Sequence, residues 1–250
     1  MPASDPGHGA LSQLGSLRIV PVIVIDDPAA ARPLADALVA GGLGCAEVTL
    51  RTPDAVAAIT GFAGNADLLV GAGTVLDPDQ VSAAVDAGAR FVVSPGFDAE
   101  VVQRCQQLGV PVLPGTATPT DIQQARRAGL TAVKYFPAET LGGVDALGAI
   151  SAPFPAMTFV PTGGITPANV GSYLRHPAVL AVGGSWMAPR RLVADRDWRQ
   201  VAELAAEAAA LAAGFPAPAT TVAGTTVAGT PAGSHAAVGA ATSGQRETRP

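Results

Sequence analysis

The chain has 250 residues, of which 15 are basic and 20 are acidic, and a formal net charge of −5. Charged residues make up 14% of it, against roughly 25% in an average domain. This composition excludes a basic groove for nucleic acid and a polybasic helix for a membrane surface. No apolar run approaches the roughly 18 residues of a membrane-spanning helix. The 48% of hydrophobic residues are enough for one large core.

The cysteines and the first residues bear on the cellular compartment. Cys45 and Cys105 form neither a disulfide framework nor a zinc site, because no Cys or His stands near them at ligand spacing. We expect both to be small buried side chains in a reducing compartment. Residues 1–16 lack the basic flank and apolar core of a secretory signal. The sequence therefore predicts a cytoplasmic protein without a metal site.

A change of composition near residue 214 sets the domain boundaries. From Phe215 to Pro250, 27 of 36 residues are Ala, Gly, Thr, Ser or Pro. Such a segment has too few large apolar groups to offset the entropy lost on ordering. We predict a disordered tail over residues 214–250, a partly disordered tail over residues 1–16, and one folded domain over residues 17–213.

Within residues 17–213, short apolar runs rich in β-branched residues alternate with alanine-rich segments of helical period. In chain order the runs centre on Val20, Val48, Val70, Val92, Val112, Val133, Phe159 and Val182. Eight strands at this regular spacing, each followed by a helix, predict an α/β fold, a single (β/α)8 or TIM barrel. The alternative is an open doubly wound sheet. It usually has fewer strands and a dinucleotide loop, and no G-x-G-x-x-G follows the first run.

Capping residues support this alternation. Asp77-Pro78 predicts the start of a helix that closes at Gly88, and Thr118-Pro119 predicts one that closes at Gly129. Each glycine stands shortly before the next apolar run, as expected of a loop from helix to strand.

The second run carries polar side chains. Side chains alternate along a strand, so Glu47, Thr49 and Arg51 share one face and the apolar residues between them share the other. The apolar face must pack on the helices, which directs the polar face into the barrel. Burial of these groups is costly unless they pair with one another or with a ligand. A structural ion pair is the alternative to a ligand site.

The sixth run contains Lys134, the single lysine of the chain. It shares a face with Ala132 and Phe136, which predicts that it points into the barrel. Loss of hydration there favours the neutral amine, which can attack a carbonyl carbon and form a Schiff base. Glu47 is the expected proton donor and acceptor, and Arg51 can bind a carboxylate through two hydrogen bonds.

The loops after the last two runs are rich in glycine, at residues 161–164 and 183–185. Barrels commonly bind phosphate through backbone N–H groups of these two loops, which predicts a phosphate site. Residues 71–74, after the third run, allow close backbone approach and offer a hydroxyl to a carboxylate or carbonyl oxygen.

Two segments, residues 42–51 and 129–139, resemble the two signature motifs of the bacterial KDPG/KHG aldolase family. Further segments resemble that family in the same order, at residues 71–76, 94–96, 161–165 and 183–186. The resemblance covers about Leu17 to Gly214. It implies a class I aldolase that cleaves 2-dehydro-3-deoxy-6-phosphogluconate (KDPG) to pyruvate and D-glyceraldehyde 3-phosphate. It further implies that the enzyme needs no metal or other cofactor and acts as a homotrimer.

The matching motifs imply a role for individual residues. Lys134 would form the Schiff base and Glu47 would transfer protons. The implied substrate contacts are Arg51, Thr74, Pro95 and Phe136 for the pyruvate part, Thr162 for the substrate chain, and Gly163, Gly164, Gly184 and Ser185 for the phosphate. One departure is Tyr135, where the family more often has Phe or Leu. Its place in the alternation is against the helices, so we expect no catalytic effect.

Other functions stay open at this point. The same lysine would serve an aldolase for 4-hydroxy-2-oxoglutarate (KHG), which yields pyruvate and glyoxylate, or one for an epimeric 2-keto-3-deoxy-phosphosugar. A non-catalytic phosphate-binding barrel is the alternative outside enzymes.

Overall fold

The computed structural model describes residues 6–216. Its strands are β1 (Ile19–Ile23), β2 (Cys45–Thr49), β3 (Leu69–Gly73), β4 (Val92–Val93), β5 (Val112–Leu113), β6 (Gly115–Thr116), β7 (Ala132–Tyr135), β8 (Thr158–Pro161) and β9 (Val182–Gly184). Its helices are α1 (Pro6–Leu17), α2 (Ala31–Ala40), α3 (Ala55–Ala63), α4 (Pro78–Asp86), α5 (Ala99–Gln107), α6 (Pro119–Arg127), α7 (Gly143–Ser151), α8 (Val170–Leu174), α9 (Arg190–Ala194) and α10 (Trp198–Ala213), with a short 3-10 helix, η1 (Pro28–Ala30). All eight predicted run centres lie in strands. Of the tail predicted over residues 214–250, residues 217–250 lie outside the described residues.

The strands pair in parallel in two sheets. One sheet has six strands in the order β5-β4-β3-β2-β1-β9, and the other has three in the order β6-β7-β8. The fifth predicted run is split at Pro114 into β5, which pairs with β4, and β6, which pairs with β7. Single bridges, Phe159 with Val179 and Thr162 with Gly183, link the two sheets on the other side. The α/β class and the parallel strands are thus confirmed, whereas the ladders form two sheets rather than one continuous eight-stranded sheet.

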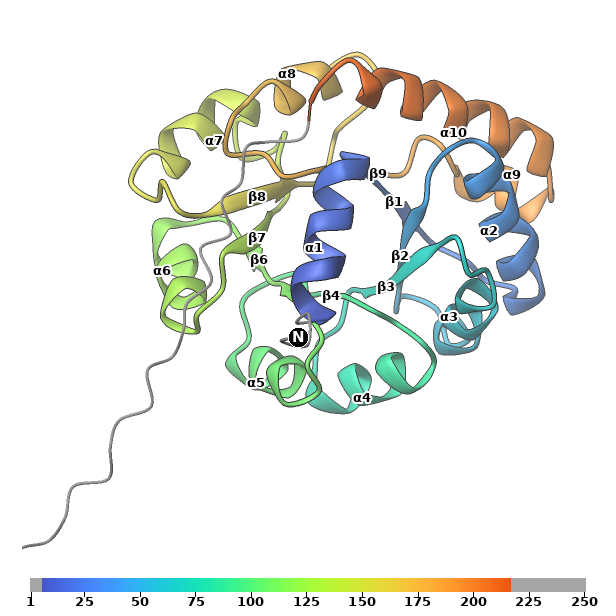
Figure 1. Ribbon diagram of the computed structural model, residues 1–250, viewed down its shortest axis with the longest axis horizontal. Coiled ribbons are helices and arrows are strands. Elements are labelled where there is room, and N and C mark those ends of the chain that lie inside the picture. The colour runs from blue at the N-terminus through green and yellow to red at the C-terminus, as the bar shows by residue number, and fades with distance from the viewer. Residues whose placement is uncertain (1–5, 217–250) are drawn as a thin grey trace, which may run out of the picture. The chain divides into compact units, whose positions relative to one another are not determined.

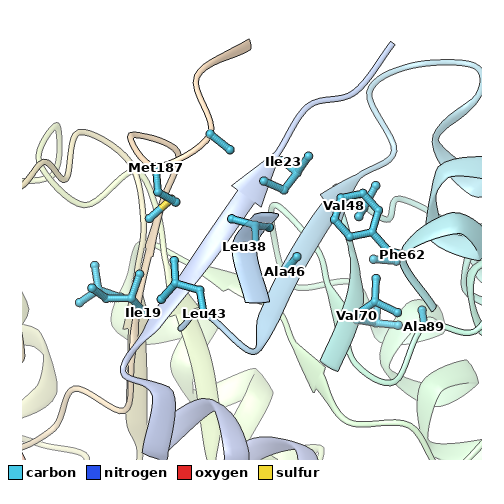
Figure 2. Packing of buried hydrophobic residues seen from close by; sticks show 14 of the residues in the cluster. Ile19, Ile23, Leu38, Leu43, Ala46, Val48, Phe62, Val70, Ala89 and Met187 are labelled. Carbon is cyan, nitrogen blue, oxygen red and sulfur yellow. The ribbon is translucent and has the colours of Figure 1, made fainter. Parts of the chain in front are cut away.

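Two buried clusters separate the two faces of the strands. The larger cluster lies between strands and helices, and Figure 2 shows part of it, with Val48 of β2 beside Phe62 of α3. The helices α2 to α10 surround the strands on this side (Figure 1). The smaller cluster, on the inner face, includes Cys45 of β2 and Ala132 of β7. Residues of opposite parity therefore face opposite sides, as the alternation predicted.

The N-terminal segment contains a helix that the sequence did not predict. Within residues 1–16, expected to be a partly disordered tail, the segment from Pro6 forms α1. Its side chains Ala10 and Leu14 are buried in the inner cluster, next to residues that begin strands, such as Cys45. Helix α1 lies across the strands in Figure 1. It therefore covers the amino ends of the strands, which leaves their carboxyl ends for a site.

Arg18 joins α1 to β1 at this covered end. It is only 3% exposed, and its guanidinium donates hydrogen bonds of 2.7 Å to the carbonyl oxygens of Leu174, Val179 and Leu180. Burial lowers the pKa of this guanidinium. These bonds tie the start of β1 to the end of α8 and the segment before β9.

The predicted helix caps are confirmed. The Asp77 carboxylate accepts the N–H of Gln80 at 2.8 Å, and Thr118 forms a capping box with Asp121. Gly88 and Gly129 follow α4 and α6 with φ values of 105° and 81°, in the left-handed region that favours glycine. No helix within residues 6–216 is long and apolar enough to span a membrane.

Candidate active site

A buried ion pair marks the site. Lys134 of β7 donates from Nζ to Oε1 of Glu47 in β2 at 3.2 Å. The two side chains are 9% and 4% exposed. The fold brings together residues that are 87 positions apart, as their alternation in the two strands predicted. Removing two charges from water is costly, so a buried ion pair adds little to the stability of the fold. A functional role explains its presence better than a structural one.

Glycine makes room for the carboxylate. Thr49 of β2 is paired with Gly73 of β3, and a Cβ at Gly73 would lie 2.6 Å from Cγ of Glu47 and contact Oε1. Only glycine therefore fits beside this side chain. Thr49 itself donates to the carbonyl of Ile23 at 2.8 Å, so its hydroxyl holds two strands together.

Phe136 covers the lysine. The Lys134 Nζ lies 5.2 Å from the centroid of the Phe136 ring, within the range of a cation–π contact. The ring is 37% exposed, at the end of β7. Lys134 therefore has a carboxylate on one side and an aromatic ring on another.

The remaining predicted contacts for the pyruvate part follow strand ends. Arg51 lies beyond β2 and is exposed, Thr74 lies directly beyond β3 and is half-buried, and Pro95 lies beyond β4 and is exposed. The carboxyl ends of parallel strands lie on the same side of the fold, so these three residues lie on the same side as Lys134. Thr74 has a φ of 57°, a strained value for a β-branched residue. Such strain concentrates at functional sites. No pattern in the sequence predicted it.

The predicted phosphate residues lie in two adjoining loops. Thr162, which is 7% exposed, is bridged to Gly183, and its Oγ1 contacts the position where a Gly183 side chain would start. Gly163 and Gly164 have φ values of 100° and 79°, which other residues rarely adopt. Gly184 is buried against the Trp186 ring, and Ser185 is exposed. The loops after β8 and β9 are therefore side by side, with their glycines in contact with neighbouring groups.

Two acidic residues after β1 have structural partners. Asp27 accepts the N–H of Ala29 at 2.9 Å and caps the 3-10 helix η1. Asp26 accepts a hydrogen bond of 2.8 Å from Arg190, and this bond lowers the pKa of Asp26. Among residues 6–216, no group of three or more His, Cys, Asp or Glu is placed to hold a metal ion.

Glu139 and Tyr173 form a contact that the sequence did not predict. Tyr173 of α8 is 1% exposed, and its hydroxyl donates to Oε1 of Glu139, in the loop after β7. Glu139 ends the segment of residues 129–139 that resembles a family motif. Its partner is 34 residues away, and no spacing rule links the two.

The fold and site define a class of protein: parallel α/β proteins with a buried lysine–carboxylate pair at the carboxyl edge of the strands. Residues 11–204 match the family model described as KDPG and KHG aldolase. The chain belongs to this family.

Individual relatives agree. A 2-dehydro-3-deoxy-phosphogluconate aldolase of Treponema pallidum is 48% identical over 192 residues, which cover 76% of this chain and 91% of the relative. A KHG/KDPG aldolase of Escherichia coli is 44% identical over 191 residues, covering 76% and 90%. A KDPG aldolase structure from Legionella pneumophila has a TM-score of 0.76 and 40% identity, and covers 81% of this chain and 97% of that one. It holds pyruvate captured at low pH as a covalent carbinolamine intermediate.

Proposed function

We propose that this chain is a class I aldolase that cleaves KDPG to pyruvate and D-glyceraldehyde 3-phosphate. The observation that carries the proposal is the buried contact of 3.2 Å between Lys134 and Glu47 in a member of the KDPG and KHG aldolase family. The carbinolamine captured in the Legionella pneumophila relative supports covalent chemistry with pyruvate.

The reaction begins with proton transfer within the pair. The Lys134 ammonium gives a proton to Glu47, and the neutral amine attacks C2 of the substrate ketone. Glu47 returns a proton to the resulting carbinolamine hydroxyl, which leaves as water, and an iminium forms. Because one carboxyl both accepts and donates, the short contact to Nζ serves each step.

The iminium then accepts electrons. Glu47, again a carboxylate after the dehydration, accepts the proton of the C4 hydroxyl, the C3–C4 bond breaks, and the bonding pair moves into the iminium to give an enamine. D-glyceraldehyde 3-phosphate leaves as the aldehyde. Glu47 protonates C3 of the enamine, and water hydrolyses the new iminium, which releases pyruvate and regenerates the amine.

The other predicted residues would bind two different parts of the substrate. Arg51 would bind the carboxylate through two hydrogen bonds, and Thr74, Pro95 and Phe136 would line the pyruvate part. The phosphate would bind the N–H groups of the glycine loops, with Thr162 beside the substrate chain. The residues of this second part are Gly163, Gly164, Gly184 and Ser185.

We infer further that the two sheets close into one (β/α)8 barrel. Its support is that β5 and β6 belong to one run interrupted only by Pro114, and that bridges join β8 to β9. Closure would set all eight strand ends around Lys134, the usual position of an active site in such barrels.

KHG is a second candidate substrate. The Escherichia coli relative is named for both KHG and KDPG, and the same lysine would serve either reaction. The substrates differ at the end that meets the glycine loops, since the KHG product glyoxylate has no phosphate.

We also propose a homotrimer, which the resemblance implies, and a cytoplasmic location, which the two isolated cysteines favour. Light scattering of the purified protein tests the first, because a trimer has about three times the mass of the 24.8 kDa chain.

Steady-state rates test the proposed function. KDPG, its galactonate epimer and KHG are each supplied as the only substrate, and pyruvate release is followed in a coupled assay. We expect the highest kcat/KM with KDPG. A higher value with the epimer or with KHG would reassign the substrate, and inactivity on all three would refute the proposal.

A further inference from the structure

The contact between Tyr173 and Glu139 lies outside the machinery described so far. Tyr173 stands on α8 and is fully enclosed at 1% exposure, and its hydroxyl donates to Oε1 of Glu139. Gly143, at the start of α7, packs close to both groups: a Cβ there would be 3.5 Å from Oε1 of Glu139 and 3.7 Å from the Tyr173 hydroxyl. A buried hydroxyl is thus committed to one carboxylate oxygen, which fixes the direction of the Glu139 side chain.

Glu139 lies against the loop proposed to bind phosphate. Its backbone N–H donates to the carbonyl of Gly163 at 3.1 Å, and the N–H of Ala138 donates to the carbonyl of Thr162 at 2.8 Å. A Cβ at Gly164 would lie 2.6 Å from the Cβ and 2.7 Å from the Cγ of Glu139. The aliphatic part of Glu139 therefore supports the Gly164 backbone directly.

This loop needs such support. Gly163 and Gly164 have no side chains of their own to pack, and both have left-handed φ values. Nδ2 of Asn169 also donates to the carbonyl of Gly164 at 3.2 Å. The loop is therefore contacted by Asn169, just before α8, and by Glu139, whose orientation depends on Tyr173 of the same helix. A displacement of Glu139 would free one side of the loop.

We propose that Tyr173 is a positioning residue that acts through Glu139 to fix the loop at Gly163 and Gly164 for the substrate phosphate. The inference rests on the proposed function, because it assigns the phosphate to this loop. The bond to Tyr173 also directs a carboxylate toward α8. An acidic side chain can thereby stand beside a loop that binds an anion without competing for its N–H groups.

The test compares KDPG with its dephosphorylated counterpart, 2-dehydro-3-deoxygluconate, in Tyr173→Phe and Glu139→Ala. Both variants should raise KM for KDPG about tenfold at unchanged kcat, because ground-state and transition-state binding of the phosphate are lost equally. Neither should change kcat/KM for the dephosphorylated substrate. Glu139→Gln keeps a carbonyl acceptor for the hydroxyl and should retain the wild-type KM.

Tyr135→Phe is the matched control. Tyr135 is also a buried tyrosine of the outer cluster, at 2% exposure, and it has no place in the proposed machinery. The control should behave as the wild type with both substrates. Covalent trapping of pyruvate on Lys134 should proceed at the wild-type rate in Tyr173→Phe, because pyruvate has no phosphate.

The outcomes separate the two proposals. If the wild type cleaves KDPG but does not distinguish it from the dephosphorylated substrate, the phosphate site and the positioning role of Tyr173 are both wrong, whereas the proposed cleavage of KDPG stands; inactivity on KDPG would refute the proposed function itself. If the wild type distinguishes them and Tyr173→Phe does so equally well, the positioning role is wrong. Equal losses with both substrates, or loss of the pyruvate adduct, would also overturn it, because a merely structural defect acts on both.

Discussion

Lys134 of β7 and Glu47 of β2 meet across the interior of the strands, with 3.2 Å between Nζ and Oε1. Lys134 is the only lysine of the sequence. The carboxylate of Glu47 occupies space that is free because residue 73 is glycine. The chemistry proposed for this protein depends on that contact.

Replacement of Glu47 by Gln should separate adduct formation from turnover. The amide keeps the shape but cannot accept and return protons, so kcat should fall by about 10²–10⁴. A covalent adduct with pyruvate should form more slowly but stay detectable, because Lys134 is intact. Coupled pyruvate release and borohydride trapping measure the two effects, and an unchanged kcat would refute the assigned role of Glu47.

Gly73→Ala should displace the carboxylate. The new methyl would enter the space occupied by Oε1 and Cγ of Glu47, so the contact to Nζ should lengthen and kcat should fall by at least about tenfold. Gly9→Ala, where nothing lies within 4 Å of the added carbon, is the control and should retain full activity. Wild-type turnover in Gly73→Ala would show that the position of Glu47 tolerates displacement.

The packing of α1 on the strands predicts a loss of stability in Leu14→Ala. Leu14 is fully buried in the inner cluster, and truncation of such a leucine costs about 2–5 kcal/mol of unfolding free energy. Gln13→Ala, on the exposed side of the same helix, should change stability by less than about 0.5 kcal/mol. Urea denaturation compares them, and equal midpoints for Leu14→Ala and the wild type would mean that α1 does not contribute to the core.

Alkaline pH should destabilise the fold. Burial raises the pKa of the Cys45 and Cys105 thiols to about 12, whereas a thiol in an unfolded chain ionises near pH ~8.5. The folded state keeps these protons where the unfolded state releases them. The contribution to stability is therefore complete below pH ~8 and decreases as the pH rises towards about 12.

Urea denaturation at several values between about pH 8 and pH 11 checks this prediction. Cys105→Ala should show a smaller decrease than the wild type, because one of the two thiols is gone. An unfolding free energy that stays constant over this range would contradict it.

The strands and the inward positions of Glu47 and Lys134 could be predicted because both depend on local periodicity. Alternation alone assigned Glu47 and Lys134 to the inner face, and the inner positions of Cys45 and Ala132 agree with it. The glycine loops after the last two runs could also be predicted, because positions with left-handed φ values favour glycine.

Other features depend on tertiary contacts that no local pattern records. Helix α1 has few apolar residues near its start, so its sequence did not predict a helix. The burial of Ala10 and Leu14 against the strands stabilises it. The strained φ of Thr74 and the contact between Tyr173 and Glu139 arise from packing between distant segments. They could not be predicted from spacing.

Reduction with borohydride in the presence of pyruvate tests the central claim most directly. Borohydride converts the iminium into a stable secondary amine, and peptide mapping locates the modified residue. We predict one adduct per chain, on Lys134, and neither adduct nor turnover in Lys134→Ala. Failure to trap pyruvate on Lys134, or turnover that persists in Lys134→Ala, would contradict the Schiff-base mechanism.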